Sequence, residues 1–406
     1  MRLGDCCKTN LHTYSDKEKW SMIRYLDTGS ITEGRIDEIQ SLYPGVDKIP
    51  SRARRKASVG DILFSTVRPN QKHYGIIEAG TENLLVSTGF TVVTVDTTIA
   101  DPYFIYYYLT QSSVIESLQA IAEQSTSTYP SIKPSDIEDI ELDLPELETQ
   151  KKIGSTLRML DRKIALNEEI NDNLRQQAQA LFKKWFVDNP DAILWKEGTF
   201  SNLIEKTISG DWGKDSPSGN NTEMVYCIRG ADIPEVRAGN KGKMPTRYIL
   251  PKNYAAKQLV DGDIVVEISG GSPTQSTGRA AAVSDALLAR YDKGMVCTNF
   301  CKALKPRAGY SMYVYYYWQY LYDRDIFFSY ENGTTGIKNL DINGFIETEP
   351  IVIAPEDLVE KFDAVCQTVF SKIYANGMEN EQLALVRDTI LPKLMSGEID
   401  VSAVQL

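Results

Sequence analysis

The chain has 406 residues, of which 42% are hydrophobic and 24% are charged, and its formal net charge is −11. A chain of this length can form two or three domains, each with its own core. The acidic balance argues against nonspecific nucleic-acid binding by the whole surface, although it allows a local basic patch.

The composition also limits location and metal chemistry. No segment approaches the roughly 18 consecutive apolar residues of a membrane span, and the first residues, MRLGDCCKTN, contain no signal-peptide core. The six cysteines show no C-x-x-C spacing, and His12 and His73 are the two histidines, which argues against a zinc site. We therefore expect a cytoplasmic protein with reduced thiols.

In chain order, the patterns predict an α/β (α+β) domain, a long helix, a second such domain and a second long helix. Residues 1–145 and 190–354 contain short β-rich runs between turns rich in Gly, Pro, Asn and Ser. Residues 146–189 and 355–406 have helical periodicity, and each segment starts at a proline, Pro145 just before the first and Pro355 in the second, that is followed by acidic residues. The aromatic stretches YFIYYYL and YVYYYWQYLY are possible base-stacking platforms, but their helical spacing favours buried helices.

The sequence contains an internal repeat. Four motifs recur in the same order at offsets of 202 to 210 residues: GDILFSTVRPN with GDIVVEISGG, STGF with CTNF, FIYYYL with VYYYWQ, and IKPSDI with IKNLDI. Ordered matches with such small drift predict two similar domains related by a pseudo-two-fold axis.

Both long helices carry a heptad seam with asparagine pairs at matching steps. The first seam comprises Ile153, Leu157, Leu160, Ile164, Asn167, Asn171, Leu174, Ala178, Leu181 and Trp185. The second comprises Phe362, Cys366, Val369, Ile373, Asn376, Asn380, Leu383, Arg387, Ile390 and Leu394. Gly377 weakens the second helix, Arg387 departs from the apolar pattern, and Pro392 predicts a kink near its end.

The asparagines suggest how the helices pair. In an antiparallel coiled coil, Asn167 would face Asn380 and Asn171 would face Asn376, so that each buried amide is satisfied by another amide. Such pairs would determine register and orientation at some cost in stability. The alternative is that these side chains lie at a hydrated edge of the seam.

Motifs for catalysis are missing from the sequence. It contains no phosphate-binding glycine loop, no metalloprotease or deaminase metal set, and no Asn-Pro-Pro-Tyr type tetrapeptide of amino-methyltransferases. Asp263 and Glu267 of DIVVEIS are candidate metal-binding carboxylates, but a solvated strand start followed by one outward-facing Glu is the favoured interpretation. We predict a non-catalytic protein without a cofactor or metal.

Basic residues gather where loops are expected, at comparable places in both repeats. Lys and Arg neutralise phosphates, whereas Arg, Gln, Asn and Ser hydrogen-bond base edges. For one such cluster an ordinary solvated face would be favoured, but their recurrence favours DNA. The candidate DNA-binding residues are Arg52, Arg54, Arg55, Lys56, Arg68, Lys72, Arg229, Lys241, Lys243, Ser272, Gln275, Thr277 and Arg279.

Several motifs together resemble the specificity subunit of type I restriction-modification systems. They are SRARRKASVGDILFSTVRPN, STGF, IKPSDIEDIELDLPELETQKKI, LRQQAQALFKKWF, GGSPTQSTGRAA, TTGIKNLDINGFIETEPIVIAP and LPKLMSGEI. The resemblance covers essentially the whole chain in the right order, and the duplicated layout belongs to it.

This resemblance implies two target-recognition domains, each of which recognises one half of a split double-stranded DNA target. It implies two modification subunits that carry S-adenosylmethionine and the adenine methyltransferase site, and restriction subunits that hydrolyse ATP and cleave DNA. The long helices would act as a ruler and as docking surfaces for the modification subunits. Because the chain is acidic, we expect tight DNA binding to require those subunits.

The helices and loops also predict the form of the target. A helix over residues 149–186 would span roughly 57 Å at about 1.5 Å per residue, which is about one and a half turns of B-DNA. The loop STVRPNQKHYG of the first repeat differs from EISGGSPTQSTGR of the second. We therefore expect an asymmetric target with two unlike halves and a short unread spacer.

Three alternatives stay open at this point. The chain could serve a different methylation or phage-defence complex, which neighbouring genes would reveal. It could be a coiled-coil scaffold that binds protein alone, in which case salt-dependent DNA binding would be absent. It could also be a cryptic nuclease, which Asp263→Ala and Glu267→Ala would test.

Overall fold

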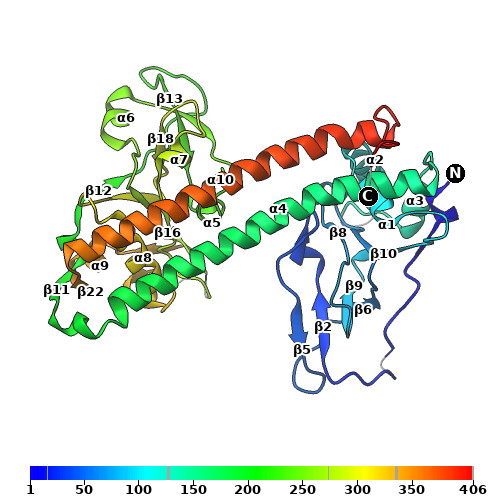
Figure 1. Cartoon of the computed structure of the whole chain (residues 1–406), viewed down its shortest axis with the longest axis horizontal. Helices are drawn as coiled ribbons and strands as arrows, with labels where there is room; N and C mark the ends of the chain where they lie inside the picture. Colours follow the sequence, from blue (N-terminus) through cyan, green and yellow to red (C-terminus); the bar gives the residue numbers. More distant parts are fainter. Residues whose placement is uncertain (16, 126–128, 273, 334–336, 405–406) are drawn as a thin grey trace. The chain divides into compact units, whose positions relative to one another are not determined.

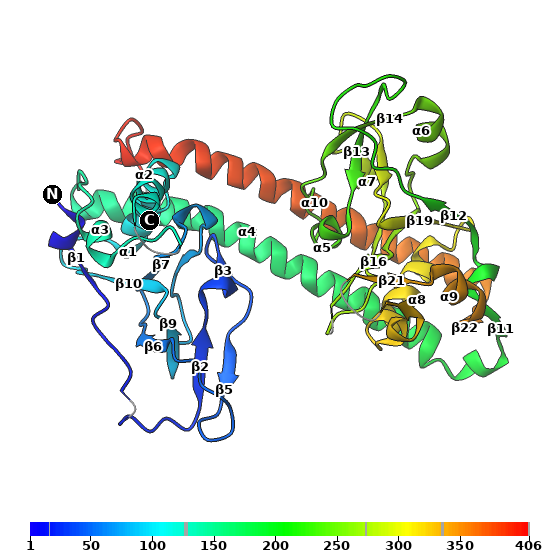
Figure 2. The ribbon, with the colours of Figure 1, turned by 180° about the vertical axis from the view of Figure 1, so that it is seen from behind.

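The structure is a computed structural model that describes all residues except 16, 126–128, 273, 334–336 and 405–406 (Figures 1 and 2). The chain forms two compact units: unit 1 is Met1–Arg162 with Leu383–Leu406, and unit 2 is Lys163–Gln382. We call the part of unit 1 before the first long helix the first domain, and the part of unit 2 between the long helices the second domain. Pro273 and residues 334–336, which belong to motifs quoted above, lie outside the described residues.

Two four-stranded sheets form the first domain. In spatial order the strands are β1 (Cys7–Thr9), β10 (Phe90–Val95), β7 (Ile62–Ser65) and β8 (Tyr74–Ile76) in one sheet, and β5 (Gln40–Leu42), β2 (Ile23–Leu26), β9 (Leu84–Ser87) and β6 (Ala53–Lys56) in the other. All neighbours are antiparallel except β2 and β9. A short hairpin of β3 (Ile31–Thr32) and β4 (Arg35–Ile36), helices α1 (Pro102–Leu109), α2 (Ser112–Glu123) and α3 (Pro134–Glu138), and 3-10 turns η1 (Leu3–Asp5), η2 (Thr28–Ser30) and η3 (Pro69–Gln71) complete it.

The second domain repeats the strand order of the first sheet, whereas its second sheet has three strands among the described residues instead of four. Its main sheet is β12 (Ile204–Ser209), β19 (Cys301–Pro306), β15 (Ile264–Glu267) and β17 (Ala280–Ala282), and its second sheet is β14 (Thr246–Ile249), β13 (Glu223–Ile228) and β18 (Met295–Cys297). Smaller sheets pair β16 (Ser269–Gly270), β21 (Lys338–Leu340) and β20 (Glu331–Asn332), and β11 (Lys196–Thr199) with β22 (Pro350–Ile353). The helical elements are η5 (Pro190–Leu194), η6 (Phe200–Asn202), η7 (Gly230–Asp232), α5 (Ile233–Arg237), α6 (Pro251–Lys257), α7 (Asp285–Leu288), α8 (Ser311–Tyr322), η8 (Ile326–Tyr330) and α9 (Ile342–Thr348).

The strand ladders correct the register of one repeat match. Phe90 of β10 pairs with Ser65 of β7, the fifth residue after the glycine that opens the GDI motif. In the second domain the fifth residue after the glycine of the GDI motif is Glu267, and it pairs with Cys301. Phe90 therefore corresponds to Cys301, so the match of STGF with CTNF is wrong by one residue. Sequence similarity over four residues is too short to resolve such a shift.

The aromatic stretches form buried helices, as predicted. In α1 the tyrosines Tyr106 and Tyr107 are buried, and in α8 the indole of Trp318 is fully buried and donates to the carbonyl of Gly278 at 2.8 Å. Phe182, at the end of the first long helix, packs against Tyr313 of α8 with ring centroids 5.8 Å apart. These rings form the domain cores and are not available for stacking on bases.

The long helices are α4 (Leu147–Phe182), which continues as the π-helical turn η4 (Lys183–Val187), and α10 (Glu356–Met395). All twenty predicted seam positions are buried or partly buried, which agrees with the predicted seam. Pro392 lies inside α10, which continues for three residues beyond it. Among the described residues, no helix is long and apolar enough to cross a membrane.

All six cysteines are buried free thiols. Burial raises the pKa of Cys227 and of Cys301 to about 12. Because the thiolate is the nucleophile, roughly one in 10,000 of these thiols is ionised at pH 8. We expect Cys227 and Cys301 to resist iodoacetamide in the folded chain and to react within minutes in 6 M guanidinium, as peptide mass spectrometry would record. Equal labelling rates in both conditions would contradict the buried placement.

Candidate nucleic-acid interface and helix pair

The predicted basic loop of the first domain is in fact a strand. Arg54, Arg55 and Lys56 belong to β6 and are partly buried, whereas Arg52 precedes the strand and is exposed. Arg55 donates to Asn10 Oδ1 at 2.5 Å and to the Phe90 carbonyl, and burial lowers its pKa. Lys56 pairs with Glu18 and lies over the Trp20 ring. Arg55 and Lys56 are thus structural cations, contrary to the prediction that the whole cluster is free to bind DNA.

Arg68 and Lys72 flank the short turn η3 after β7, and both are exposed. Both have left-handed backbone angles, with φ of +49° and +57°. The Arg68 guanidinium lies 5.2 Å from the centroid of the Tyr129 ring, and Lys72 Nζ lies 2.6 Å from Glu33 Oε1. Non-glycine residues adopt this conformation uncommonly, so the turn presents two cations at some conformational cost.

In the second domain the structure brings Arg229 and Lys243 together. Arg229 makes two hydrogen bonds to the buried Asp232, at 2.8 and 3.0 Å, and a third to the Lys243 carbonyl at 2.7 Å. Hydrogen bonds and charge from Arg229 lower the pKa of Asp232 although burial opposes this. Lys243 is exposed, and Lys241 Nζ lies 4.7 Å from the centroid of the Tyr291 ring. These contacts hold a basic rim in place.

Only part of the predicted loop SGGSPTQSTGR is available to a ligand. Gln275 is exposed and Ser272 partly so, and the Ser272 amide donates to the Gln275 carbonyl at 2.7 Å. Thr277 is fully buried, with its amide and hydroxyl 2.6 and 2.9 Å from Glu331 Oε1. Thr277 is therefore a structural residue, and its prediction as a DNA contact is wrong.

The guanidinium of Arg279 is likewise occupied. Its Nε and Nη2 atoms each lie 2.8 Å from the carboxylate of Glu267, whose side chain is 8% exposed. Arg279 is therefore not the free loop cation that the sequence suggested. Glu267 is buried rather than outward-facing, which corrects the prediction for that strand. The sequence around Glu267 does not indicate that its partner is an arginine twelve positions further along the chain.

Asp263 is also buried, contrary to the expected solvated strand start. It accepts the Val260 amide at 2.8 Å and pairs with Lys305. Asp61 in the first domain accepts the Ser58 amide in the same way at 2.7 Å. The carboxylate therefore caps the turn before the central strand in both domains. Among the described residues, no three His, Cys, Asp or Glu side chains are grouped as a metal site would require.

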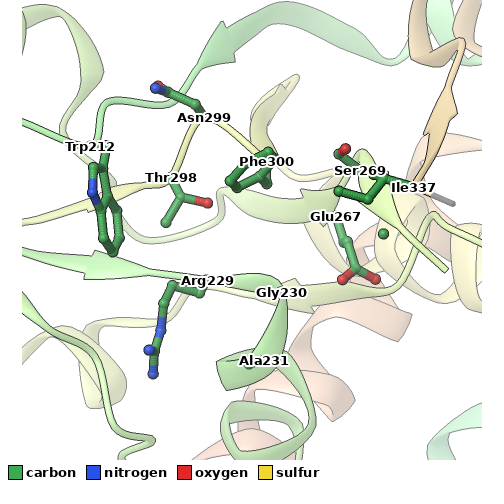
Figure 3. A pocket seen from close by; sticks show the side chains of 11 residues that line it. Trp212, Arg229, Gly230, Ala231, Glu267, Ser269, Thr298, Asn299, Phe300 and Ile337 are labelled. Atoms are coloured by element: carbon green, nitrogen blue, oxygen red, sulfur yellow. The ribbon is translucent and has the colours of Figure 1, made fainter.

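A cavity of about 560 Å³ opens beside Arg229 in the second domain (Figure 3). Several of its exposed lining residues were missed from the sequence, among them Trp212, Asn299, Phe300 and Ile337. Phe300 is 60% exposed. The motifs CTNF and IKNLDI, which contain three of these residues, were interpreted as repeats and not as a site.

The asparagines of the long helices form the amide pairs that the heptad seam suggested. Asn167 Nδ2 donates to Asn380 Oδ1, and Asn376 Nδ2 donates to Asn171 Oδ1, both at 2.8 Å. All four side chains are buried. Because 167 pairs with 380 and 171 with 376, α4 and α10 run antiparallel in unit 2, where they lie side by side (Figures 1 and 2).

Arg387, which interrupts the apolar seam of α10, has a partner in unit 1. Its Nη1 lies 2.6 Å from Asp161 Oδ1 of α4, and Tyr107 donates to the other oxygen of this carboxylate at 2.6 Å. Burial disfavours the charged guanidinium, but Asp161 and Asp388 outweigh this and raise the pKa of Arg387. In unit 1 the ion pair between Arg387 and Asp161 thus replaces an apolar contact at the one seam position of α10 where the apolar pattern is interrupted by a charged residue.

Comparisons with known proteins found one family model and several relatives that are similar to this chain. Residues 4–176 match the family described as type I restriction modification DNA specificity domain. The chain is 25% identical to the type I restriction enzyme HindI specificity subunit of Haemophilus influenzae over 98% of both chains. It is 26% identical to the type I restriction enzyme MjaIX specificity subunit of Methanocaldococcus jannaschii over 84% of this chain and 78% of that one.

A solved structure shares the fold. The S subunit of a type I restriction-modification system from M. genitalium superposes with a TM-score of 0.54 at 16% identity, covering 97% of this chain and 95% of that chain. The sequence matches point to one group of proteins: over nearly its whole length the chain is similar to specificity subunits of type I restriction-modification systems.

Proposed function

We propose that this chain selects the DNA target of a type I restriction-modification complex and directs adenine methylation and restriction by its partner subunits. The observation that carries this function is the match to a type I specificity subunit over 98% of both chains. The chain itself is non-catalytic, and catalysis belongs to the modification and restriction subunits.

Each domain would recognise one half of a split target. The main sheets of both domains have the same strand order, whereas the surfaces of the domains differ. The first presents Arg52, Arg68 and Lys72, and the second presents Lys243 and Gln275 and contains a cavity. Exposed cations position a protein on phosphates, and polar side chains discriminate base edges. Unlike surfaces on a common scaffold support an asymmetric target with two different halves.

The long helices would set the distance between the half-sites and receive the modification subunits. Their seam side chains are buried or partly buried, so the pairing occupies one face of each helix and would leave other faces for partners. Two modification subunits would complete a clamp around the DNA, since a chain of net charge −11 binds the phosphate backbone poorly by itself.

Exchange of the second domain tests this assignment of half-sites. Residues 190–354 would be replaced by the equivalent segment of another specificity subunit, and adenine methylation would be sequenced in cells that also express the modification subunit. We expect one half of the methylated motif to change while the other half stays the same. A motif in which both halves change, or neither, would contradict one domain per half-site, and loss of all DNA binding would favour a protein-binding scaffold.

A further inference from the structure

The cavity beside Arg229 exists in the second domain because two side chains differ from their counterparts in the first. In the first domain the Thr66 amide donates to the Gly89 carbonyl at 2.8 Å, and in the second the Ile268 amide donates to the Phe300 carbonyl at 2.9 Å. Together with the corrected ladder register, these bonds show that Phe300 stands where the first domain has Gly89. A β-carbon on Gly89 would lie only 2.8 Å from Cγ2 of Thr28. The first domain therefore has no room for a side chain there.

The second domain has the opposite arrangement. The parallel ladders pair Leu26 with Val86 in the first domain and Ile228 with Cys297 in the second, so Leu26 and Ile228 are equivalent. Two residues further along the chain, Thr28 of the first domain therefore corresponds to Gly230 of the second. Gly230 supplies no side chain, and Phe300 turns outward with 60% of its surface exposed. The exchange of a threonine for glycine and of a glycine for phenylalanine opens the cavity and gives it an aromatic wall (Figure 3).

The floor of the cavity is also particular to the second domain. Glu267 occupies the step held by Ser65 in the first domain, and it is held by two hydrogen bonds from Arg279. A β-carbon on Gly230 would lie 2.3 Å from Glu267 Oε1, so only glycine lets the backbone approach this carboxylate. A buried ion pair is costly to build unless its geometry is good, and here it supports a cavity rather than a packed core.

The walls of the cavity carry the groups that a flat, polar-edged ring would contact. Arg247 lies over one face of the Trp212 indole, with its Cζ 4.1 Å from the ring centroid, and donates to the Trp212 carbonyl at 2.7 Å. The indole is therefore held in place while it lines the cavity. Thr298 Oγ1 is buried there and has no hydrogen-bond partner among the described residues. The exposed amide of Asn299 stands at the rim.

We propose that this cavity receives one unstacked nucleobase of the half-site recognised by the second domain. This inference rests on the proposed function and adds a ligand to one of its surfaces. Aromatic side chains stack on bases of any sequence, and the exposed Asn299 amide can hydrogen-bond the edge of the ring. The volume, about 560 Å³, lies within the range of small-ligand pockets, about 300–1,000 Å³.

DNA is the favoured source of the base because the cavity opens within a basic rim. Arg229 lines it, and the exposed Lys243 is joined to Arg229 through its carbonyl. Extruding a base from a duplex costs free energy, which protein contacts must offset. Phosphate contacts by these cations would hold the backbone on both sides of the displaced nucleotide. A free nucleoside has the same ring but no phosphate, so its binding would be stabilised less by these cations.

The test uses the complex of this chain with its modification subunit and duplexes that contain the methylated motif. Each position of the second half-site in turn carries 2-aminopurine, whose emission rises when the base leaves the stack. The methylated adenine is expected to respond in every variant, because the methyltransferase of the modification subunit extrudes its target base. We expect a response at one further position with the unaltered chain and its loss in Phe300→Gly, which copies the Gly89 of the first domain. Affinity for the duplex should fall about 5- to 100-fold, the range for losing one stacked base. Tyr43→Gly, at an exposed tyrosine of the first domain, should change neither measurement.

The outcomes separate this inference from the function on which it rests. If duplex binding and the motif are intact but no position of the second half-site other than the methylated adenine responds, the cavity does not hold a DNA base. The same conclusion follows if Phe300→Gly keeps both the additional response and the affinity. If free adenosine or thymidine quenches the Trp212 fluorescence without DNA, and no duplex position other than the methylated adenine responds, the site belongs to a free nucleoside. If no motif is methylated at all, the proposed function fails together with it.

Discussion

Replacing Asn171 by leucine should destabilise unit 2 by about 3 kcal/mol, because one amide satisfies several buried groups and each unpaired group costs about 1–3 kcal/mol. Asn171 Nδ2 lies 3.1 Å from the carbonyls of Ala238 and Ile373, and Asn171 Oδ1 accepts from Asn376. Leucine would leave the Asn376 amide without its partner. Urea unfolding followed by tryptophan fluorescence measures this, since four of the five tryptophans belong to unit 2: Trp185, Trp195, Trp212 and Trp318.

A double-mutant cycle isolates the amide pair. Asn376→Leu alone should also destabilise, whereas the combination of Asn171→Leu with Asn376→Leu should lose less than the sum of the two, because apolar groups facing each other leave no amide unpaired at the seam. Asn173→Leu, at an exposed position of the same helix, is the matched control and should change the free energy of unfolding by less than about 0.5 kcal/mol. Strict additivity in the cycle would show that the two amides do not stabilise each other.

Replacing Gly377 by alanine should destabilise the protein by about 3 kcal/mol, although helix propensity alone predicts a gain of about 1 kcal/mol. A β-carbon at this position would lie 1.9 Å from the Gly239 carbonyl oxygen. That carbonyl cannot easily move away, because Arg290 donates to it at 2.6 Å and also pairs with Glu381 of α10. The same urea titration measures the change.

The sign of this result separates the two explanations of the glycine. Ala375→Gly, at an exposed position two residues earlier in α10, is the control in the reverse direction and should cost about 1 kcal/mol through propensity alone. A more stable Gly377→Ala variant would mean that the loop around Gly239 does not press on the helix. The sequence analysis treated Gly377 as a weakness of the helix, whereas in the structure it is the place where the second domain reaches α10.

Periodic features were the ones that the sequence predicted well. The heptad seam, the two buried aromatic helices and the amide pairs follow from residue spacing, because a helix repeats its faces every few residues and buried amides need partners. The register of the repeat at Phe90 could not be obtained in the same way. A one-residue shift between two short motifs changes which side chain enters the core, and only the ladder pairing resolves it.

The candidate DNA surface was predicted less well, for a physical reason. Charge clusters in sequence indicate cations but not their partners, and Arg55, Lys56 and Arg279 each engage a group that is distant in sequence. An exposed aromatic residue cannot be recognised from the sequence either, because nothing in the residues around Phe300 distinguishes it from a phenylalanine of the core. Long-range pairing and exposure are properties of the tertiary fold, which local patterns do not encode.

Target selection by this chain can be measured by single-molecule sequencing of adenine methylation in cells that express a modification subunit with and without the chain. We expect a bipartite, asymmetric motif that is methylated only when the chain is present. A motif that is methylated equally in its absence would contradict the claim that this chain selects the target.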